Sequence, residues 1–492
     1  MKHFNIVIVG LGPTGGTLGN LLAMHGLSIL IIEKENSSYQ LPRAVHFDDE
    51  VMRVFDTIGI ASRLRKKIII NKGTRFIDRD GKTVLDWPRP KKITENGWYP
   101  SYRFHQPDLE RLLYKQLRSF KKVKIIRNSS VVKITEKVGY VEVEFICSEV
   151  GISKFVKADY LVGCDGSNST TRESAEIKLD NLGFSQRWAV TDLILRKKKK
   201  SLPDRTIQFC NHNQPVTYCR NVGSRRRWEF ALKNQKEEVM NLSEEFIWNF
   251  LKPWLLLEDA YIERKTVYVF NSTLARKWRR GRIFIAGDAA HTMPPFMGQG
   301  MCAGIRDVSN LAWKIAYCIK NKNVSRLLDT YETERKPNVQ EYIQTTMKMG
   351  ELINAFGTDK ITDSLTGKPD GSREMQSIKP ELGSGLGSTA ILNRGKVFPS
   401  ILTHAGKKVD ALFSLKPVLF CNDTSGKNLR SEFFKVYNEK QIPELTRVFE
   451  DFDSNAILVR PDRFILASKS KKENTETFFN KIVKNFKCYF KS

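Results

Sequence analysis

The feature that most constrains the fold of this chain is the motif Gly10-Leu11-Gly12-Pro13-Thr14-Gly15, which joins a strand-like run to a helix-like run. Residues 4–9 are apolar and rich in β-branched side chains, which predicts a short buried strand. Residues 14–25 follow with helical spacing, and residues 28–32 form a second strand-like run. A strand, a helix and a strand in this order predict a βαβ unit, which requires a parallel sheet.

The glycines of this motif suit one chemical task. Gly10 permits a tight turn, Gly12 lets the backbone approach a pyrophosphate at the helix N-terminus, and Gly15 lets helix and strand pack closely. Glu33 ends the second strand, where its carboxylate can accept hydrogen bonds from both hydroxyls of a ribose. A glutamate here disfavours a 2′-phosphate, so the pattern predicts FAD or NAD rather than NADP. The alternative is a glycine-rich turn without a nucleotide.

A second glycine-rich segment follows the predicted strand of residues 283–286. Gly287-Asp288-Ala289-Ala290-His291 is followed by Pro294-Pro295 and by Gly298-Gln299-Gly300, after which residues 300–320 have helical spacing. An Asp at the end of a strand can bind the ribityl chain of a flavin, and the glycines allow the backbone to lie near an isoalloxazine ring. The helix dipole would then face the edge of the ring that gains negative charge on reduction. The alternative is a turn that serves packing alone.

Three further segments of the sequence carry structural signals. Asp165-Gly166-x-x-Ser169-x-x-Arg172 follows a predicted strand, although alone it is only a turn. Short β-type runs from Trp188 to about Phe270 predict a mainly antiparallel sheet, inserted into the first domain. Residues 325–336 predict a helix that ends at Pro337. We therefore expect a discontinuous FAD-binding domain of residues 1–185 and 271–356, and a substrate sheet of residues 186–270 with part of 70–105. A linker of residues 357–390 and a C-terminal segment of residues 391–492 would follow.

The composition is ordinary except for charge. The chain has 492 residues, and no apolar run reaches the roughly 18 residues that a membrane helix needs, so we expect a cytoplasmic protein without a membrane span. The formal net charge of +27 could attract polyanions, anionic lipid or an anionic substrate. Because the lysines are spread out, we favour a solvated surface and expect no nucleic-acid partner. The eight cysteines lie far apart, so neither a metal site nor a dithiol is expected.

Two basic segments have competing interpretations. An apolar stripe near the C-terminus recurs at helical spacing among lysines, and it could lie on a membrane surface or, as we favour, pack on its own domain. Its residues are Phe478, Phe479, Ile482, Val483, Phe486 and Phe490. Arg225-Arg226-Arg227 could anchor an anion, but an exposed turn is the favoured interpretation.

Together, the motifs resemble those of the class A FAD-dependent aromatic hydroxylases, the family with the para-hydroxybenzoate hydroxylase fold. Residues 42–50, 301–307 and 460–464 resemble most closely the 3-(3-hydroxyphenyl)propionate hydroxylases, and the resemblance covers nearly the whole chain. It implies a mixed α/β fold with a Rossmann-like FAD-binding domain, an inserted antiparallel sheet and a small thioredoxin-like C-terminal segment without a dithiol. One departure is Gln214, which stands where close relatives tend to carry an arginine and cannot supply a cation.

The resemblance also implies residue roles. Arg43 and Gln106 match positions near the pyrophosphate and flavin, Asp165 matches a motif that serves FAD and the nicotinamide cofactor, and His46 is a candidate for acid–base work or a hydrogen-bonded structural histidine. The full set of cofactor-binding candidates is Gly10, Gly12, Pro13, Thr14, Gly15, Glu33, Lys34, Arg43, Gln106, Asp165, Gly287, Asp288, Pro295, Gly298, Gln299, Gly300 and Met301.

The activity that the resemblance implies is hydroxylation of a phenolic aromatic acid. NADH or NADPH would reduce non-covalently bound FAD, and O2 would form a flavin C4a-hydroperoxide that hydroxylates the ring. The expected substrate is 3-(3-hydroxyphenyl)propionate or 3-hydroxycinnamate, which would give the 2,3-dihydroxy product. The alternatives are a monooxygenase of a polyketide or antibiotic, a flavin-dependent dehydrogenase, and a non-catalytic flavoprotein. A homodimer is a further expectation.

Overall fold

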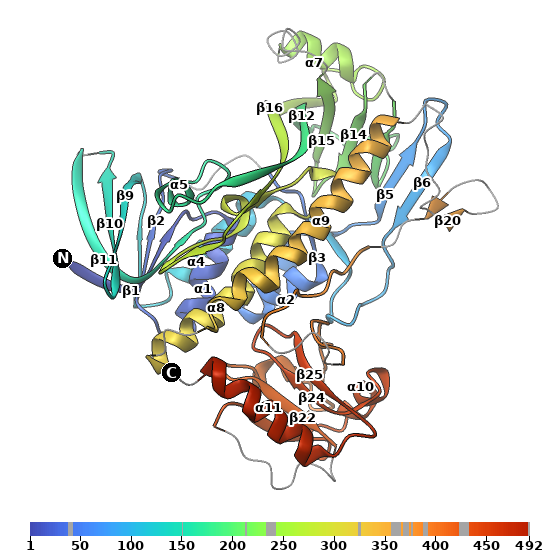
Figure 1. Cartoon of the computed structure of the whole chain (residues 1–492). Coiled ribbons are helices and arrows are strands. Elements are labelled where there is room, and N and C mark those ends of the chain that lie inside the picture. The colour runs from blue at the N-terminus through green and yellow to red at the C-terminus, as the bar shows by residue number, and fades with distance from the viewer. Residues whose placement is uncertain are drawn as a thin grey trace.

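The chain folds into three parts that Figure 1 separates clearly. The structure is a computed structural model, and it describes residues 1–37, 43–149, 151–211, 214–232, 243–322, 326–355, 366–367, 373–374, 377–386, 392–422 and 432–490. An N-terminal part contains an eight-stranded sheet, a ten-stranded sheet lies beside it, and the C-terminal part forms a four-stranded sheet of its own. The predicted mixed α/β fold is confirmed.

The eight-stranded sheet is built on the predicted βαβ unit. Its order is β17-β18-β11-β1-β2-β8, and β9 and β10 extend it beside β11. The neighbours from β18 to β8 are all parallel. The strands are β1 (Lys2–Val9), β2 (Ile29–Ile32), β8 (Val123–Ile126), β9 (Ser129–Lys137), β10 (Tyr140–Cys147), β11 (Ile152–Gly163), β17 (Arg279–Arg280) and β18 (Ile283–Ile285). β1 and β2 are nearly continuous apolar runs because a parallel sheet is covered on both faces.

The ten-stranded sheet has the order β19-β16-β12-β15-β14-β13-β5-β6-β21-β20. Its strands are β5 (Gly73–Ile77), β6 (Thr83–Pro88), β12 (Leu179–Leu195), β13 (Thr206–Phe209), β14 (Val216–Arg220), β15 (Arg225–Leu232), β16 (Ala260–Ala275), β19 (His291–Thr292), β20 (Thr366–Gly367) and β21 (Arg373–Glu374). The expected domain boundaries at 185/186 and 270/271 fall inside β12 and β16, two long strands that run from one part into the other (Figure 1).

Two smaller sheets complete the strands. β3 (His46–Asp48), β7 (Ser101–Arg103) and β4 (Ile69–Ile70) form a three-stranded sheet in that order. The C-terminal sheet has the order β23-β22-β24-β25, in which β22 and β23 are parallel and the other pairs are antiparallel. Its strands are β22 (Val418–Cys421), β23 (Lys435–Asn438), β24 (Ser454–Val459) and β25 (Ile465–Ser470).

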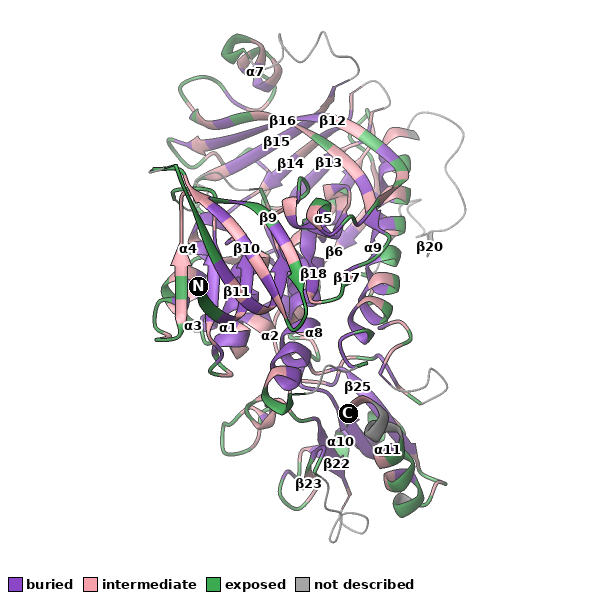
Figure 2. Cartoon of the chain, turned by 60° about the vertical axis from the view of Figure 1, so that its left-hand side comes forward, coloured by how far each residue is buried: buried purple, intermediate pink, exposed green. Residues whose placement is uncertain are grey.

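The helices cover the faces of these sheets, and Figure 2 shows the buried residues concentrated where strands and helices meet. The α-helices are α1 (Pro13–Ala23), α2 (Asp49–Thr57), α3 (Ala61–Arg65), α4 (Gln106–Leu117), α5 (Thr170–Ser174), α7 (Glu244–Leu251), α8 (Gly300–Asn321), α9 (Thr330–Ala355), α10 (Leu445–Asp451) and α11 (Thr475–Phe490). Three short 3₁₀ turns are η1 (Gly287–Ala289), η2 (Pro295–Met297) and η3 (Val409–Leu412). No helix in the described ranges is both long and apolar enough to cross a bilayer.

The prediction that Pro337 ends a helix is wrong, because α9 continues through it to Ala355. A proline at this position removes the N–H that would bond the carbonyl of Thr333, four residues earlier. The segment around Gly383 packs against this turn, and the Gly383 N–H donates to the Glu334 carbonyl at 2.9 Å. Gly383 also lies so close that a Cβ there would be 2.4 Å from the Thr333 oxygen and 2.6 Å from the Pro337 ring. A segment from elsewhere in the chain therefore covers the helix where the proline interrupts its hydrogen bonding.

The two basic segments are also resolved. In α11, Phe478 and Ile482 are buried, and the Phe479 ring lies 5.4 Å from the Phe434 ring, so the described part of the stripe packs on its own domain. The favoured interpretation of an exposed turn at Arg225–Arg227 is wrong. The three arginines open β15, and Arg226 and Arg227 are buried on its two faces.

Candidate active site

The three glycine-bearing segments meet at one edge of the eight-stranded sheet. Val9 pairs with Ile32 on one side and with Gly163 on the other, and Gly163 pairs with Ile285. Since these strands are parallel, their carboxyl ends lie together. Gly10 and Glu33 follow those ends directly, and Asp165 and Asp288 follow within three residues, so segments that are far apart in the sequence form one rim.

The glycines of this rim are in close contact with one another. A Cβ at Gly10 would lie 2.4 Å from the Cys164 carbonyl oxygen, and one at Gly15 would lie 2.1 Å from the Gly10 oxygen. Gly287 has φ +62, and a Cβ there would lie 2.8 Å from the Thr14 hydroxyl oxygen. These positions exclude larger residues because the protein itself fills the space. Thr14 thus joins the first segment to the third.

Two glycines differ because they face open space. A Cβ at Gly12 would meet no atom within 4 Å, and one at Gly300 would meet only the Met293 Cγ, at 3.9 Å. Gly12 is the N-cap of α1, with Pro13 as the first residue of that helix, and Gly300 is the first residue of α8, followed by half-buried Met301. Backbone N–H groups at a helix N-terminus favour an anionic ligand. The N-termini of α1 and α8 therefore each have open space in which an anionic ligand could bind.

Glu33 lies beside the first loop, as predicted. Its Oε2 accepts from the Leu11 N–H at 2.6 Å and its Oε1 from the Glu35 N–H at 2.9 Å, whereas Lys34 is exposed. Gln106 is buried at the start of α4, and its Oε1 accepts from the N–H groups of Arg43, at 3.0 Å, and Ala44, at 2.8 Å. Gln106 therefore fixes the backbone at Arg43.

Asp165 uses its carboxylate within its own loop. Oδ1 accepts from the Ser169 hydroxyl at 2.6 Å, and Oδ2 accepts from the Thr171 N–H at 2.9 Å. The Arg172 Nη1 donates to the Ser167 carbonyl at 2.9 Å and to the Ala289 carbonyl at 3.2 Å. Arg172 thus links the segment that contains Asp165 to the segment that contains Asp288.

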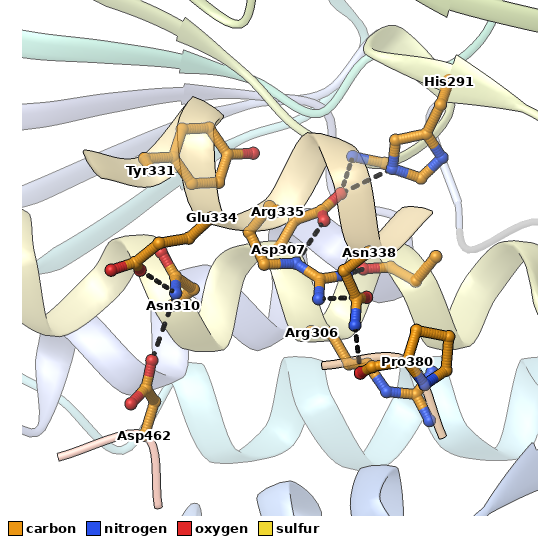
Figure 3. A network of polar contacts seen from close by, with 12 residues as sticks. His291, Arg306, Asp307, Asn310, Tyr331, Glu334, Arg335, Asn338, Pro380 and Asp462 are labelled. Atoms are coloured by element: carbon orange, nitrogen blue, oxygen red, sulfur yellow. Dashed lines mark hydrogen bonds and ion pairs between the residues drawn. The ribbon is translucent and has the colours of Figure 1, made fainter. Parts of the chain in front are cut away.

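Asp288 is exposed, whereas its neighbours Gly287 and Ala289 are buried. Desolvation by the surrounding protein raises the pKa of its carboxyl. Asp307 fixes the backbone of this turn, because its Oδ2 accepts from the Gly287 N–H at 3.1 Å and from His291 Nε2 at 2.7 Å. Arg335 Nε donates to the other oxygen of Asp307 at 3.0 Å (Figure 3). Burial alone would raise the pKa of Asp307, but His291 and Arg335 outweigh it and hold that pKa low.

His46 fixes the loop that contains Pro295 and Gly298. Its Nδ1 lies 3.1 Å from the Gly298 carbonyl oxygen and its Nε2 lies 2.7 Å from the Ser101 hydroxyl oxygen. Burial, with Arg103 and Arg89 nearby, lowers the pKa of His46 to about 3. The ring is therefore neutral at ordinary pH, with Nδ1 as donor to the carbonyl and Nε2 as acceptor from the hydroxyl.

Gln299 turns its side chain away from the loop into a buried ion cluster. Its Nε2 donates to Asp48 at 3.2 Å and its Oε1 accepts from Arg306 at 3.0 Å. Arg306 in turn pairs with Asp48 at 2.5 Å and with Glu50 at 2.6 Å. Gln299 thus anchors the loop to α2 and α8, which its position in the motif did not indicate.

The ten-stranded sheet presents a polar face to this loop. Tyr218, Trp228 and Phe230 pack on the opposite face with α7, so the alternating residues Cys219, Arg227 and Glu229 lie on the inner one. At one end of the inner face, the Trp188 ring lies 5.6 Å from that of Phe296 in the loop. This surface combines an aromatic end with a charged end.

The charged end was not predicted from the sequence. Arg227 pairs with Asp192 at 2.7 Å and donates to the Arg43 carbonyl at 2.9 Å. Arg103 is buried beside them and donates to the Thr206 hydroxyl. The sequence carries no signal for its burial, because strand alternation places Arg103 on the face opposite Tyr102 and Phe104 and predicts an exposed arginine there.

These features fit FAD: an open glycine at each of two helix N-termini, an acid at the end of β2, and an exposed carboxylate in the turn after β18. A family model described as an FAD binding domain matches residues 3–346. This chain belongs to that family. The predicted FAD cofactor is thereby confirmed, and the hydroxylases that follow confirm the predicted family and enzyme class.

Curated members of the hydroxylase family are similar over most of the chain. A probable NADH-specific resorcinol 4-hydroxylase of Rhodococcus jostii is 34% identical over 421 residues, which are 84% of this chain and 77% of the relative. A 3-(3-hydroxy-phenyl)propionate/3-hydroxycinnamic acid hydroxylase of Mycolicibacterium smegmatis is 32% identical over 351 residues, which are 71% of this chain and 61% of the relative. The chain therefore spans less than two thirds of that second relative.

Solved hydroxylase structures share the fold. A ternary complex of aklavinone-11 hydroxylase with FAD and aklavinone aligns with a TM-score of 0.77 at 19% identity, over 98% of this chain and 99% of that one. The flavin-dependent monooxygenase PieE, in complex with FAD and substrate, aligns with a TM-score of 0.77 at 17% identity over the same shares. At these identities the likeness concerns the fold.

Proposed function

We propose that this hydroxylase uses NADH and O2 to hydroxylate a phenolic aromatic acid, with 3-(3-hydroxyphenyl)propionate or 3-hydroxycinnamate as substrate and the 2,3-dihydroxy acid as product. The observation that carries the proposal is the inner face of the ten-stranded sheet, which offers aromatic contacts at one end and buried cations at the other. A molecule with a ring and a carboxylate matches both ends. The substrate named for the M. smegmatis relative has this chemistry.

The proposed FAD contacts follow from the rim. The open glycine at Gly12 leaves room for the pyrophosphate, Glu33 is placed for the ribose, and Asp288 for the ribityl chain. Bound FAD would accept hydride from the nicotinamide and activate oxygen. The loop at Gly298 and the aromatic end of the sheet would then exclude water from the ring and the substrate.

His46 suits a positioning role better than the acid–base role considered from the sequence. Both of its ring nitrogens are in hydrogen bonds, and its pKa of about 3 leaves it neutral. It therefore holds the Gly298 carbonyl and with it the loop beside the proposed flavin position.

Resorcinol is the second candidate substrate, because the R. jostii relative carries that name and aligns over more of the chain. The same name supports NADH over NADPH as the co-substrate.

The test is turnover by the purified protein. Its visible spectrum reports bound flavin, and the oxidation of NADH and of NADPH is followed with 3-(3-hydroxyphenyl)propionate, 3-hydroxycinnamate and resorcinol under air and under argon. We expect oxygen-dependent NADH oxidation stimulated by the two acids, and a product heavier by one oxygen atom. Turnover that continues under argon would instead indicate a dehydrogenase. Light scattering of the same sample tests the expected homodimer.

A further inference from the structure

Two arginines near His46 lack a counter-charge. Arg103 is 7% exposed, and Arg89 is half-buried with its guanidinium 4.0 Å from the centroid of the Trp87 ring. Neither forms an ion pair with a carboxylate in the part of the chain that the structure describes. A buried cation is normally paired, because desolvation without a partner is costly.

Hydrogen-bond donors in the same place have no acceptor. The Nε of Arg103, the Nε of Arg89 and the Nε1 of Trp87 are all buried and unbonded. Trp87 belongs to β6, Arg89 directly follows that strand, and the Arg89 guanidinium lies over the Trp87 ring. Buried donors are almost always satisfied in folded proteins, so this group indicates a missing acceptor.

The nearby carboxylates are already committed. Asp48 pairs with Arg306, Asp49 accepts from the Thr94 hydroxyl and from Asn96 at 2.9 Å, and Glu229 lies 3.5 Å from Arg227. Burial lowers the pKa of Arg89 to about 10, and it lowers the pKa of Arg103 too. Both shifts have the direction expected of cations whose charge is not neutralised by the protein.

These groups lie between the loop and the sheet. Arg103 pairs directly with His46 across β7 and β3, and it reaches Thr206 on β13. Trp87 packs in one cluster with Met297 of the loop and Trp188 of the inner face. Arg103 and Arg89 therefore line the same space between the loop and the sheet as the aromatic residues of the proposed substrate site.

We propose that Arg103, assisted by Arg89, binds the carboxylate of the substrate and selects phenolic acids over neutral phenols. A carboxylate would supply the missing negative charge and accept from the free guanidinium N–H groups. This inference rests on the proposed function, whose substrate class it narrows.

The test measures binding to the FAD-loaded protein without NADH, by the change in flavin absorbance. The ligands are 3-(3-hydroxyphenyl)propionate, its neutral amide and resorcinol. The variants are Arg103→Gln, Arg103→Lys and, as a matched control, Arg226→Gln, which alters a buried arginine of β15 on the face of the ten-stranded sheet that packs against α7. The wild type should bind the acid at least tenfold more tightly than the amide, a factor that corresponds to about 1.4 kcal/mol.

Arg103→Gln should abolish this preference by weakening the acid about tenfold or more while leaving the amide within about twofold. Arg103→Lys should restore part of the preference, and Arg226→Gln should leave it unchanged. Equal binding of acid and amide to the wild type, or an equal loss of both in Arg103→Gln, would overturn the anchor. If Arg103→Gln does not fold, Arg89→Gln serves in its place, and the wild-type comparison needs no variant.

The anchor and the activity can fail separately. Tight, Arg103-dependent binding of the acid without hydroxylation would refute the proposed function and keep the anchor. Hydroxylation of resorcinol by a protein that does not prefer the acid over the amide would refute the anchor and keep a hydroxylase.

Discussion

At the residue scale, two glycines of one motif have different roles, since Gly12 leaves room for FAD and Gly15 allows close packing. Substitutions at the two positions should therefore have different effects. Gly12 has φ −67 and open space at its Cβ position, whereas a Cβ at Gly15 would lie 2.1 Å from a backbone oxygen. Gly12→Ala should leave the unfolding free energy of the apoprotein within about 1 kcal/mol and weaken FAD at least about tenfold. Gly15→Ala should destabilise the apoprotein by about 3 kcal/mol.

Urea unfolding of the apoprotein and a flavin fluorescence titration measure the two effects. Unchanged FAD affinity in Gly12→Ala would show that the pyrophosphate does not lie against this residue.

The second prediction concerns His46 and the dependence of protein stability on pH. Its pKa is about 3 in the fold and about 6.5 in an unfolded chain, so below pH 6.5 the unfolded state binds the proton first. The stability that the neutral ring contributes is complete above pH 6.5 and is lost as the pH falls toward 3, at up to about 1.4 kcal/mol per unit. His46→Gln lacks this titration. The unfolding free energy of the wild type minus that of the variant should therefore be about 2 kcal/mol smaller at pH 5 than at pH 7.5, as measured by urea unfolding. A difference independent of pH would mean that His46 is not buried in its neutral form.

At the scale of the element, α9 depends on a segment far away in sequence. Pro337 lies inside the helix, and Gly383 packs on the ring and bonds the backbone beside it. A proline inside a helix costs about 3 kcal/mol relative to alanine, so Pro337→Ala should stabilise the protein by about 1 kcal/mol after the loss of ring packing. Gly383→Ala should destabilise it by about 2 kcal/mol or more, because the methyl group would overlap the Thr333 oxygen. Thermal unfolding of both variants checks this, and a stabilised Gly383→Ala would contradict the close approach.

At the scale of the whole molecule, a buried ion cluster joins the C-terminal part to the FAD-binding part. Glu334 of α9 pairs with Lys314 of α8 at 2.7 Å and with Arg460 at 2.8 Å, and Arg460 pairs with Asp462 at 2.6 Å (Figure 3 shows Glu334 and Asp462 on either side of Asn310). Opposing burial, Arg460 and Lys314 hold the pKa of Glu334 well below its usual range.

Removing that one negative charge should affect both parts together. Glu334→Gln leaves Lys314 and Arg460 underneutralised in the interior and should lower the unfolding free energy by about 3–5 kcal/mol. The control Glu341→Gln, on the exposed side of the same helix, should change it by no more than about 0.5 kcal/mol. In calorimetry the variant should unfold in one transition at lower temperature. Two separate transitions would show that the C-terminal part folds independently.

The sequence by itself determined the strands and turns that carry the cofactor chemistry. The glycine motif, Glu33 and the Gly287–Gly300 segment follow local rules, because strand periodicity and positive φ depend on near neighbours. Parallel pairing then forces their strand ends together, which made it predictable that these candidate FAD-binding residues lie at one edge of the sheet. Only the tertiary structure decided the rest: that α9 passes through Pro337, that Gln299 turns away from the loop, that His46 is neutral, and that Arg103 is buried without a counter-charge. Each of these depends on which distant side chains fill, bond or neutralise a site, and spacing along the chain carries no information about that.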